Sequence, residues 1–234
     1  MRTKALLLAA AFAAAGVATS MAQVYSVNAV GYVNKTLVPG FNLISNPLTA
    51  ADNTIGTLFM NFQGGPRDGT TVYRFANGNF QTASFDVFAN AYGGDAASQT
   101  TLPGEGVFVF LPNPAAGEAP NKVLTFVGEV PQGPTSTPLP RGFSIKSSVV
   151  PQAIAPDQAA NTGGAAGSAA IPAADGDTLY QYDTSIKNYN AISYDQFGGW
   201  ATALPVFQVG DAFFYFRLGA ATTWNRTFDV NNPS

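Results

Sequence analysis

The sequence contains no cysteine and no histidine, and only 11% of its 234 residues are charged, against about 25% in an average soluble protein. Without these two residue types the chain cannot build a disulfide, a thiolate nucleophile, a histidine-based catalytic pair or an imidazole metal ligand. The formal net charge is −3, and Lys and Arg are scattered along the chain. This charge pattern argues against nucleic acid and anionic lipid as partners.

Carboxylates are the remaining groups for catalysis, as in the paired acids of glycoside hydrolases. The chain has only three glutamates, Glu105, Glu118 and Glu129, and most of its aspartates adjoin glycine or a loop. Several acids recur at matching places of the repeat described below, which favours a role as turn formers or caps. The sequence has neither a Ser-x-x-Lys motif nor a phosphate-binding glycine loop that leads into a helix. We therefore expect no enzyme activity, no catalytic residue and no cofactor.

One short segment, Asp175-Gly176-Asp177, begins like a calcium-binding loop. That pattern needs a further oxygen ligand at position 179, where Leu179 stands. The preferred interpretation is an Asp-Gly turn without a metal. A cation held by Asp175 and Asp177 is the alternative.

The N-terminus has the three parts of a secretory signal peptide. Arg2 and Lys4 give a basic start, Ala5–Val17 is apolar, and Ser20-Met21-Ala22 is a small-x-small cleavage site. The apolar stretch is shorter than the roughly 20 residues that a membrane-spanning helix needs, so a retained anchor helix is the less favoured alternative. We predict cleavage after residue 22 and export to the periplasm, the cell surface or the medium. We expect no membrane insertion of the mature chain.

The mature chain repeats itself in order, at offsets between 102 and 109 residues. The matching segments are Pro39–Ile44 with Arg141–Lys146, Asp68–Phe75 with Asp175–Tyr182, Ser84–Asp86 with Ser193–Asp195, Tyr92–Gly94 with Phe197–Gly199, and Gly104–Phe110 with Gly210–Phe216. One such match could arise by chance in a chain rich in Gly and Phe, but five matches in the same order indicate an internal duplication.

Each copy has the pattern of β-strands. Thr71, Tyr73 and Phe75 alternate with other residues at a period of two, and the hairpin signal Asn77-Gly78 follows. Residues 107–110 and 213–216 are apolar at every position, which is typical of a strand covered on both faces. A short helix is expected within 51–62 and a long loop over 152–174. We predict an all-β protein with two tandem β-sandwich or small-barrel-like domains.

The predicted domain boundaries follow from the repeat and from proline content. Residues 1–22 are the signal peptide, 23–130 the first β domain and 141–234 the second. Residues 131–140 contain four prolines, which predicts a stiff, extended linker between the domains.

Aromatic residues beside Gly-Gly pairs suggest a carbohydrate-binding alternative, because exposed rings can stack on sugar faces. The candidate rings are Tyr92, Phe197 and Trp200, which adjoin Gly-Gly pairs, and Trp224, which lies among polar Thr and Asn residues. The competing interpretation is that these rings cap the open ends of the sheets, and most of the other rings are expected in the core.

The start of the mature chain predicts a strand that needs a partner. Residues 23–34 are uncharged and β-prone, with Val24, Val27, Val30 and Tyr32 as the candidate pairing residues. Such a strand either closes its own domain or pairs with the next molecule, as donor strands do. Head-to-tail pairing between copies would give open filaments or sheets.

The opening segment Val24–Asn34, with Gly40–Leu48, Gly104–Gly106, Phe126–Gly133 and Thr222–Phe228, resembles a family of uncharacterised secreted two-repeat proteins found mainly in verrucomicrobial bacteria. The resemblance covers nearly the whole mature chain. It implies export and the two-copy plan, and it supplies no functional residues.

These observations favour a non-catalytic structural or cell-surface protein, with self-assembly by strand pairing as its mode of action. The alternative is an extracellular carbohydrate-binding module with polysaccharide as its partner.

Overall fold

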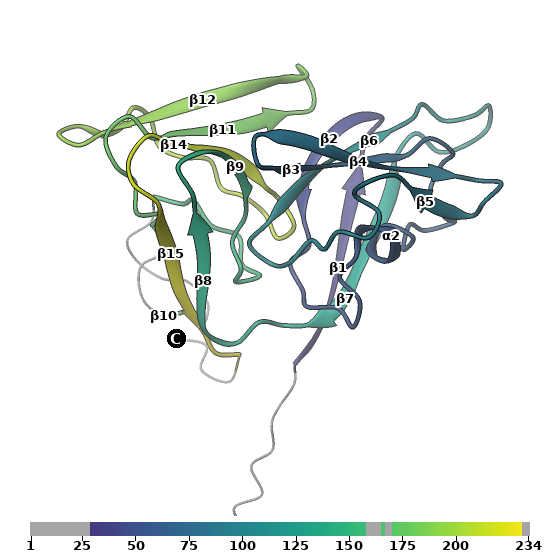
Figure 1. Cartoon of the computed structure of the whole chain (residues 1–234), viewed down its shortest axis with the longest axis horizontal. Coiled ribbons are helices and arrows are strands. Elements are labelled where there is room, and N and C mark those ends of the chain that lie inside the picture. The colour runs from purple at the N-terminus through teal and green to yellow at the C-terminus, as the bar shows by residue number, and fades with distance from the viewer. Residues whose placement is uncertain (1–28, 158–164, 167–169, 231–234) are drawn as a thin grey trace, which may run out of the picture.

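The computed structural model describes residues 29–157, 165–166 and 170–230, and within them the chain consists mainly of β-strands. Two halves lie next to each other, and each half contains a five-stranded sheet and a smaller sheet (Figure 1). The all-β class and the plan in two halves are thereby confirmed. No helix within the described ranges has the length and hydrophobicity of a membrane span. The predicted signal peptide lies outside the described residues.

The first half contains strands β1 to β7 and one short helix. Its five-stranded sheet has the order β2-β6-β3-β4-β5, and β1 pairs with β7 in a separate antiparallel ribbon. The bounds are β1 Val30–Leu37, β2 Gly40–Ser45, α2 Ile55–Leu58, β3 Thr71–Ala76, β4 Asn79–Asp86, β5 Ala91–Gly93, β6 Gly106–Leu111 and β7 Lys122–Glu129.

The second half repeats this plan strand by strand. Its five-stranded sheet has the order β9-β14-β11-β12-β13, and β8 pairs with β15 as β1 pairs with β7. The bounds are β8 Gly133–Leu139, β9 Gly142–Lys146, β10 Ala165–Ala166, β11 Thr178–Asp183, β12 Asn188–Asp195, β13 Gly199–Trp200, β14 Phe213–Arg217 and β15 Thr222–Phe228. Only β10, which extends the ribbon beside β15, lacks a counterpart among the described strands of the first half.

The pairing register repeats as well as the strand order. Thr71 lies opposite Ser84 between β3 and β4, and Thr178 lies opposite Ser193 between β11 and β12. The hydroxyls of the two pairs are 2.8 and 3.1 Å apart. The internal repeat predicted from the sequence is therefore present as a repeat of topology and register.

Residues 131–140 do not form the predicted linker, because most of them belong to β8. This strand pairs with β15 over its whole length, and Pro134 and Pro138 lie within it. β8 is an edge strand, and the direction of successive N–H groups alternates along a strand. Pro134 and Pro138 are four residues apart, so their backbone nitrogens point to the same side of β8. The N–H groups that prolines lack can therefore fall on the open edge of the strand. The second half thus begins near Gly133 and not at Arg141.

The helix and loop expectations hold in part. The helix expected within 51–62 exists, but it is the short α2, Ile55–Leu58. In the loop expected over 152–174, Ile154 forms an isolated bridge with Phe207, and β10 is a short strand. Residues 158–164 and 167–169 of this loop lie outside the described residues.

Each half has its own buried core between the inner face of the five-stranded sheet and the ribbon. The first core includes Leu37, Phe59, Val72, Val109 and Phe126. The second includes Leu139, Leu179, Phe213, Tyr215 and Trp224. Burying each large apolar side chain contributes roughly 1.5–3 kcal/mol, so hydrophobic burial stabilises each half in a chain that lacks disulfides.

The two halves meet in a contact that is made twice. The Ser45 amide donates to the Gly210 carbonyl at 2.9 Å, and the Ser147 amide donates to the Gly104 carbonyl at 3.1 Å. Each serine hydroxyl also donates to the carbonyl of the residue that follows the glycine. Because the residues of one contact are the repeat equivalents of those in the other, the junction has an approximate two-fold symmetry.

Candidate functional site

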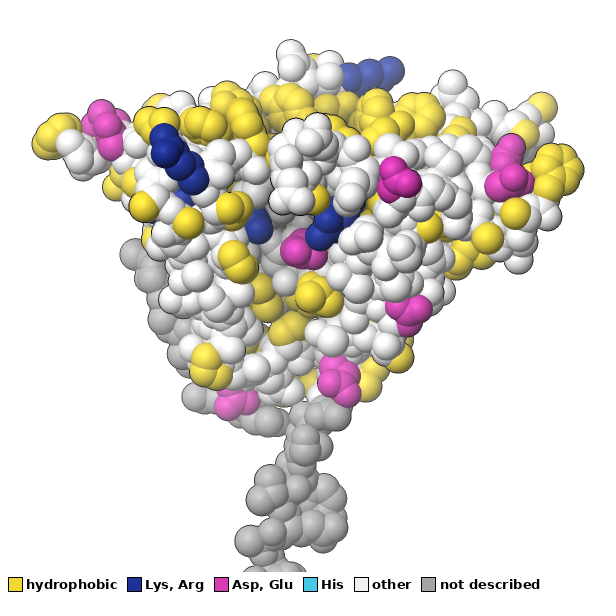
Figure 2. All heavy atoms as spheres, in the orientation of Figure 1, with side chains coloured by type: hydrophobic (Ala, Val, Ile, Leu, Met, Phe, Trp, Pro, Cys, Tyr) yellow, Lys and Arg dark blue, Asp and Glu magenta, His cyan; other side chains and the backbone are white. Residues whose placement is uncertain are grey.

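The outer faces of the two five-stranded sheets are covered by aromatic rings. Side chains alternate along a strand, so Val72 of β3 packs into the core while Tyr73 and Phe75 point to the opposite face. We call this surface the aromatic face; its members are Phe41, Tyr73, Phe75, Phe80, Phe108, Phe110, Phe143, Tyr180, Tyr182, Tyr189, Phe214 and Phe216. Figure 2 shows hydrophobic side chains gathered along the edge of the molecule where these sheets lie in Figure 1.

The packing of the rings repeats between the halves. The ring centroids of Phe75 and Phe80 are 5.0 Å apart, and those of their equivalents Tyr182 and Tyr189 are 5.3 Å apart. Both pairs are edge-on, which is the arrangement that the aromatic quadrupole favours. The duplication has therefore kept the arrangement of the surface rings as well as the fold.

The rings also connect the two halves. Phe108 meets Tyr182 at 5.4 Å, and the equivalent pair, Phe214 and Phe75, meets at 5.5 Å. Phe108 and Phe214 themselves lie 5.9 Å apart. Such aromatic pairs contribute about 0.5–1.5 kcal/mol each beyond the burial of area. The aromatic face is thus a single surface to which both halves contribute.

Two open grooves lie in the aromatic face. Groove A has a volume of about 400 Å³ and is lined by Phe75, Gly78, Phe143, Tyr180, Tyr189 and Phe214. Groove B has a volume of about 390 Å³ and is lined by Phe41, Tyr73, Phe80, Phe108, Tyr182, Lys187 and Tyr189. The repeat equivalents of the six residues of groove A all line groove B, which Tyr189 lines in addition. Both volumes lie within the range of about 300–1,000 Å³ that is typical of ligand pockets.

The grooves offer apolar surface and few polar groups. Among the residues that the structure describes, Lys187 is the only one with a charged side chain that lines either groove. Burial raises the pKa of Tyr189 to about 12 and also raises the pKa of Tyr182, so both phenols are neutral near pH 7. The grooves are suited to an apolar or aromatic group of a partner.

Two turns carry fully exposed phenylalanines. Phe88, between β4 and β5, is 97% exposed, and Phe197, between β12 and β13, is 89% exposed. The amide of Phe88 donates to Asp86 and the amide of Phe197 donates to Asp195, both at 2.8 Å. These turns lie at opposite ends of the molecule's long axis (Figure 1). The aspartates hold each turn in a defined conformation, so the two exposed rings are presented on equivalent supports.

The recurring acids hold turns, as predicted. Asp68 accepts the amide of Val87 at 3.0 Å, and its equivalent Asp175 accepts the amide of Gln196 at 3.2 Å. Glu105 likewise accepts a backbone amide three residues before it, as Asp211 does in the second half.

The structure corrects one of the sequence matches. Tyr92 lies opposite Phe85, and Trp200 lies opposite Tyr194, which is the equivalent of Phe85. Tyr92 therefore corresponds to Trp200, whereas the sequence comparison matched it to Phe197. The equivalent of Phe197 is Phe88. The mismatch arose because the turn between β12 and β13 is one residue shorter than the turn between β4 and β5.

The four rings proposed for carbohydrate binding do not form one surface. Tyr92 is 8% exposed and packs against Phe85 in the first core, and Trp224 is 2% exposed in the second core. Trp200 is half-buried against Tyr194. Only Phe197 is available at the surface, so the carbohydrate site proposed at these four residues is not supported.

The described part of the predicted pairing segment is paired within its own half. Val30 lies opposite Glu129 and Tyr32 opposite Val127, both on β7. Both side chains are exposed. Val24 and Val27 lie outside the described residues. Of the two alternatives for this segment, closure of its own domain is the one seen for residues 30–37.

Asp177 of the candidate calcium loop is fully buried and engaged by protein groups. Its carboxylate forms an ion pair with Arg217 at 2.8 Å and accepts the Tyr215 hydroxyl at 2.7 Å. It also accepts the amides of Ala174 and Leu218. The described residues contain no group of three or more acids placed to hold a metal ion.

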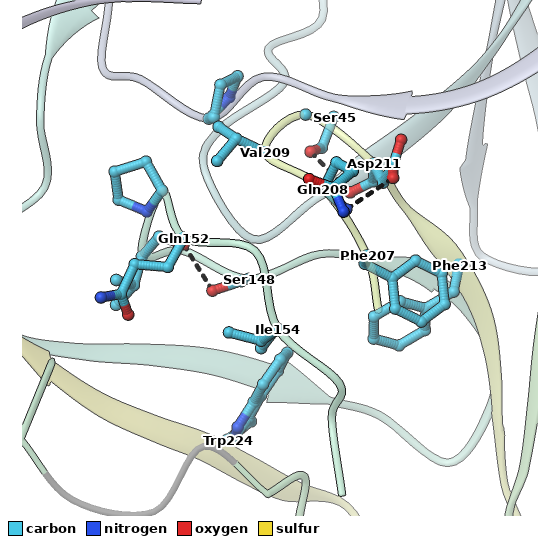
Figure 3. A pocket seen from close by; sticks show the side chains of 14 residues that line it. Ser45, Ser148, Gln152, Ile154, Phe207, Gln208, Val209, Asp211, Phe213 and Trp224 are labelled. Atoms are coloured by element: carbon cyan, nitrogen blue, oxygen red, sulfur yellow. Dashed lines mark hydrogen bonds between the residues drawn. The ribbon is translucent and has the colours of Figure 1, made fainter. Parts of the chain in front are cut away.

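The cavity shown in Figure 3 lies at the junction of the halves, between Ser45, Asp211 and Trp224. Its volume is about 10 Å³, which is at the lower limit for a single water molecule. The cavity is therefore part of the packed junction and not a ligand site.

The aromatic face was not predicted, although the sequence carried a signal for it. The matched segments keep a ring at each surface position: Tyr73 becomes Tyr180, Phe75 becomes Tyr182 and Phe108 becomes Phe214. Core positions are also apolar, so this pattern alone did not show which face of the sheet was covered.

Comparison with models of known protein families, with curated proteins and with solved structures found no match. The resemblance of the opening segment to secreted verrucomicrobial proteins therefore stays a prediction.

Proposed function

We propose that this protein is a non-catalytic structural protein of the cell exterior that assembles from copies of itself through its aromatic face. The observation that carries the proposal is the duplicated set of two grooves and two exposed phenylalanines. Export rests on the predicted signal peptide, and each half is proposed to be sandwich-like, with the sheet and the ribbon as its two layers.

An exposed aromatic surface of this kind calls for a partner. Phe41, Phe80, Phe143 and Tyr189 are each between 39% and 50% exposed, although they pack against neighbouring rings. Contiguous apolar patches on soluble proteins commonly mark interaction sites. Aromatic residues are also the ones most enriched at the centres of protein interfaces.

Each copy has two exposed phenylalanine rings and two grooves lined by aromatic rings. Each exposed ring of one copy therefore has an aromatic groove available on another copy. A copy that places Phe88 or Phe197 into groove A or B buries the ring against other aromatic side chains. The phenylalanines lie at the ends of the molecule and the grooves lie between them, so the contact is heterologous. A heterologous contact that does not close into a ring gives a filament or sheet.

Charge is complementary across this contact. The turn of Phe88 carries Asp68 and Asp86, and the turn of Phe197 carries Asp175 and Asp195. Lys187, which lines groove B, has the opposite sign. Complementary charges steer association and fix its orientation.

This proposal places assembly on the face of the sheets and not on the edge of β1. β1 pairs with β7 along one edge, so strand addition at its other edge is the alternative to this proposal. The hydrogen-bonding groups of the grooves are tyrosine hydroxyls and the Lys187 ammonium on otherwise apolar walls, so polysaccharide binding at the grooves is the weaker alternative.

Sedimentation velocity of the mature chain, residues 23–234, tests the proposal. We expect species larger than the monomer, which increase with protein concentration, and a monomer for the double variant Phe88→Ser, Phe197→Ser. Val206→Ser is the matched control, because Val206 is also an exposed apolar residue outside both grooves and both turns; it should assemble like the unmodified chain. A monomeric unmodified chain at high concentration, or assembly that survives the double substitution, would contradict the proposal.

A further inference from the structure

A polar pocket lies between the two halves, next to groove A. Its volume is about 210 Å³, and Phe75 and Phe143 line both this pocket and groove A. Its polar lining includes Arg74, Glu105 and Lys146. Figure 2 shows basic side chains on both sides of an acidic one in a hollow between the halves.

Lys146 is the least satisfied charged group in this pocket. Lys146 is only 9% exposed. Its side-chain ammonium makes no hydrogen bond or salt bridge to any residue that the structure describes. Burial lowers the pKa of Lys146, and the nearby carboxylate of Glu105 opposes this effect. A buried ammonium without a partner is costly, so an anion placed here would stabilise it.

Two hydroxyls of the lining also lack partners. Thr101 and Ser144 are buried, and their side-chain oxygens form no hydrogen bond with the described part of the chain. An unsatisfied buried polar group costs about 1–3 kcal/mol. One pocket is therefore lined by an ammonium and by two buried hydroxyls that have no partner in the described part of the chain.

The repeat-equivalent residues of the other half do not form such a polar pocket lining. Ile44 stands at the position of Lys146, and Gln181 stands at the position of Arg74. Asp211, the counterpart of Glu105, forms an ion pair with Lys35. The polar pocket is thus not a necessary product of the repeated fold, because the fold exists without it in the other copy.

Asn42 is the repeat equivalent of Ser144, and the two residues also differ in their hydrogen bonding. Its side-chain amide donates to the carbonyls of Val38 and Gly40, at 2.8 and 3.1 Å. The polar side chain at this position therefore has hydrogen-bond partners in the first half. In the second half, the Ser144 hydroxyl has none within the described part of the chain.

The charges and walls of the pocket define a class of ligand. Arg74 and Lys146 against Glu105 leave one net positive charge, which suits a single carboxylate, and Arg binds carboxylates with a planar pair of donors. The Glu105 carboxylate in the lining can accept hydrogen bonds from ligand hydroxyls. Phe75 and Phe143 supply flat apolar walls, of the kind that pack on a sugar ring.

We propose that this pocket binds a hydroxylated monocarboxylate of the acidic-sugar class, such as a uronic acid residue. The site does not depend on the self-assembly proposed above, since its polar groups lie within one molecule. It is also distinct from the four aromatic residues that the sequence suggested for carbohydrate binding.

Isothermal titration calorimetry of the mature chain tests the site with three probes: glucuronate, glucose and acetate. We expect saturable binding of glucuronate and at least tenfold weaker binding of both other probes, because each supplies only part of the recognised chemistry. Equal binding of acetate would reject the sugar class, and equal binding of glucose would reject the carboxylate. No binding of glucuronate would reject the site.

Substitutions taken from the other half provide matched variants. Lys146→Ile and Arg74→Gln copy the residues found at Ile44 and Gln181, so each should fold, as circular dichroism can verify. We expect at least a tenfold loss of glucuronate affinity in each, and no change in Lys122→Gln, which removes a cation that lines neither the pocket nor the grooves. Glucuronate binding that is unchanged in folded Lys146→Ile would overturn the assignment.

Discussion

At the scale of single residues, several acidic side chains hold turns or buried hydrogen-bond networks in place. Asp86 and Asp195 fix the turns that present the exposed phenylalanines, and Asp177 holds a buried network with Arg217 and Tyr215. A buried charge pair is sensitive to the loss of one partner, because the remaining charge is left without compensation in a poorly solvated place.

Asp177→Ala should lower the free energy of unfolding by about 3–5 kcal/mol. The substitution leaves the buried Arg217 guanidinium without its opposite charge and two backbone amides without their acceptor. Urea denaturation followed by circular dichroism measures the effect.

Asp175→Ala is the control at the other acid of the same loop. Asp175 is exposed and accepts one amide, that of Gln196, so its loss should cost about 1 kcal/mol. Similar costs for the two substitutions would show that the Asp177 network does not carry the stability assigned to it.

At the scale of elements, the junction between the halves depends on close approach. A Cβ at Gly106, the first residue of β6, would lie 2.5 Å from a methyl group of Ile145 and 2.6 Å from the Cβ of Ala212. Ala212 is the repeat equivalent of Gly106. Only one of the two equivalent positions can therefore carry a methyl group.

Gly106→Ala should lower the free energy of unfolding by about 1–3 kcal/mol, because overpacking forces the two halves apart. Adding Ala212→Gly should recover only part of the lost stability. It removes the clash with the Ala212 methyl group, but the clash of the new methyl group with Ile145 remains. Urea denaturation of the single and double variants measures both effects.

Gly93→Ala is the matched control, because a Cβ at Gly93 meets no atom within 4 Å. Its effect should stay within about 0.5 kcal/mol. A Gly106→Ala variant as stable as Gly93→Ala would contradict the close packing of the junction.

Sequence patterns predicted the elements with local signals and missed those that depend on a distant strand. The Asn77-Gly78 turn has the positive φ angles of 52° and 79° that its residue types favour. The strand β6 is buried at nearly every position, as its apolar run indicated. Strand β8 was missed because its prolines suggested a linker, and its partner β15 lies about ninety residues away in the sequence.

At the scale of the whole molecule, the duplication was predictable and the candidate sites were not. Repeated segments in a fixed order indicated two equivalent halves. Whether a ring lies in the core or on the surface depends on how the sheet and ribbon pack, which the period of two does not specify. The polar pocket depends on differences between the copies, such as Lys146 in place of Ile44, and these become meaningful only once the junction is known.

In the proposed assembly, an exposed phenylalanine of one copy occupies a groove of the aromatic face of another. The chain has no cysteine, so single cysteines can report this contact. Ala89→Cys places a thiol beside Phe88, and Lys187→Cys places one at groove B. The control variant is Ser136→Cys, on the exposed edge strand β8 away from the five-stranded sheets (Figure 1).

The most direct measurement is the yield of disulfide-linked dimer under mild oxidation in equimolar mixtures of these variants. We expect the mixture of Ala89→Cys with Lys187→Cys to form the mixed dimer in severalfold higher yield than the mixture of Ala89→Cys with Ser136→Cys. Adding Phe88→Ser and Phe197→Ser to the Ala89→Cys chain should abolish this excess. Equal yields in the two mixtures would contradict the claim.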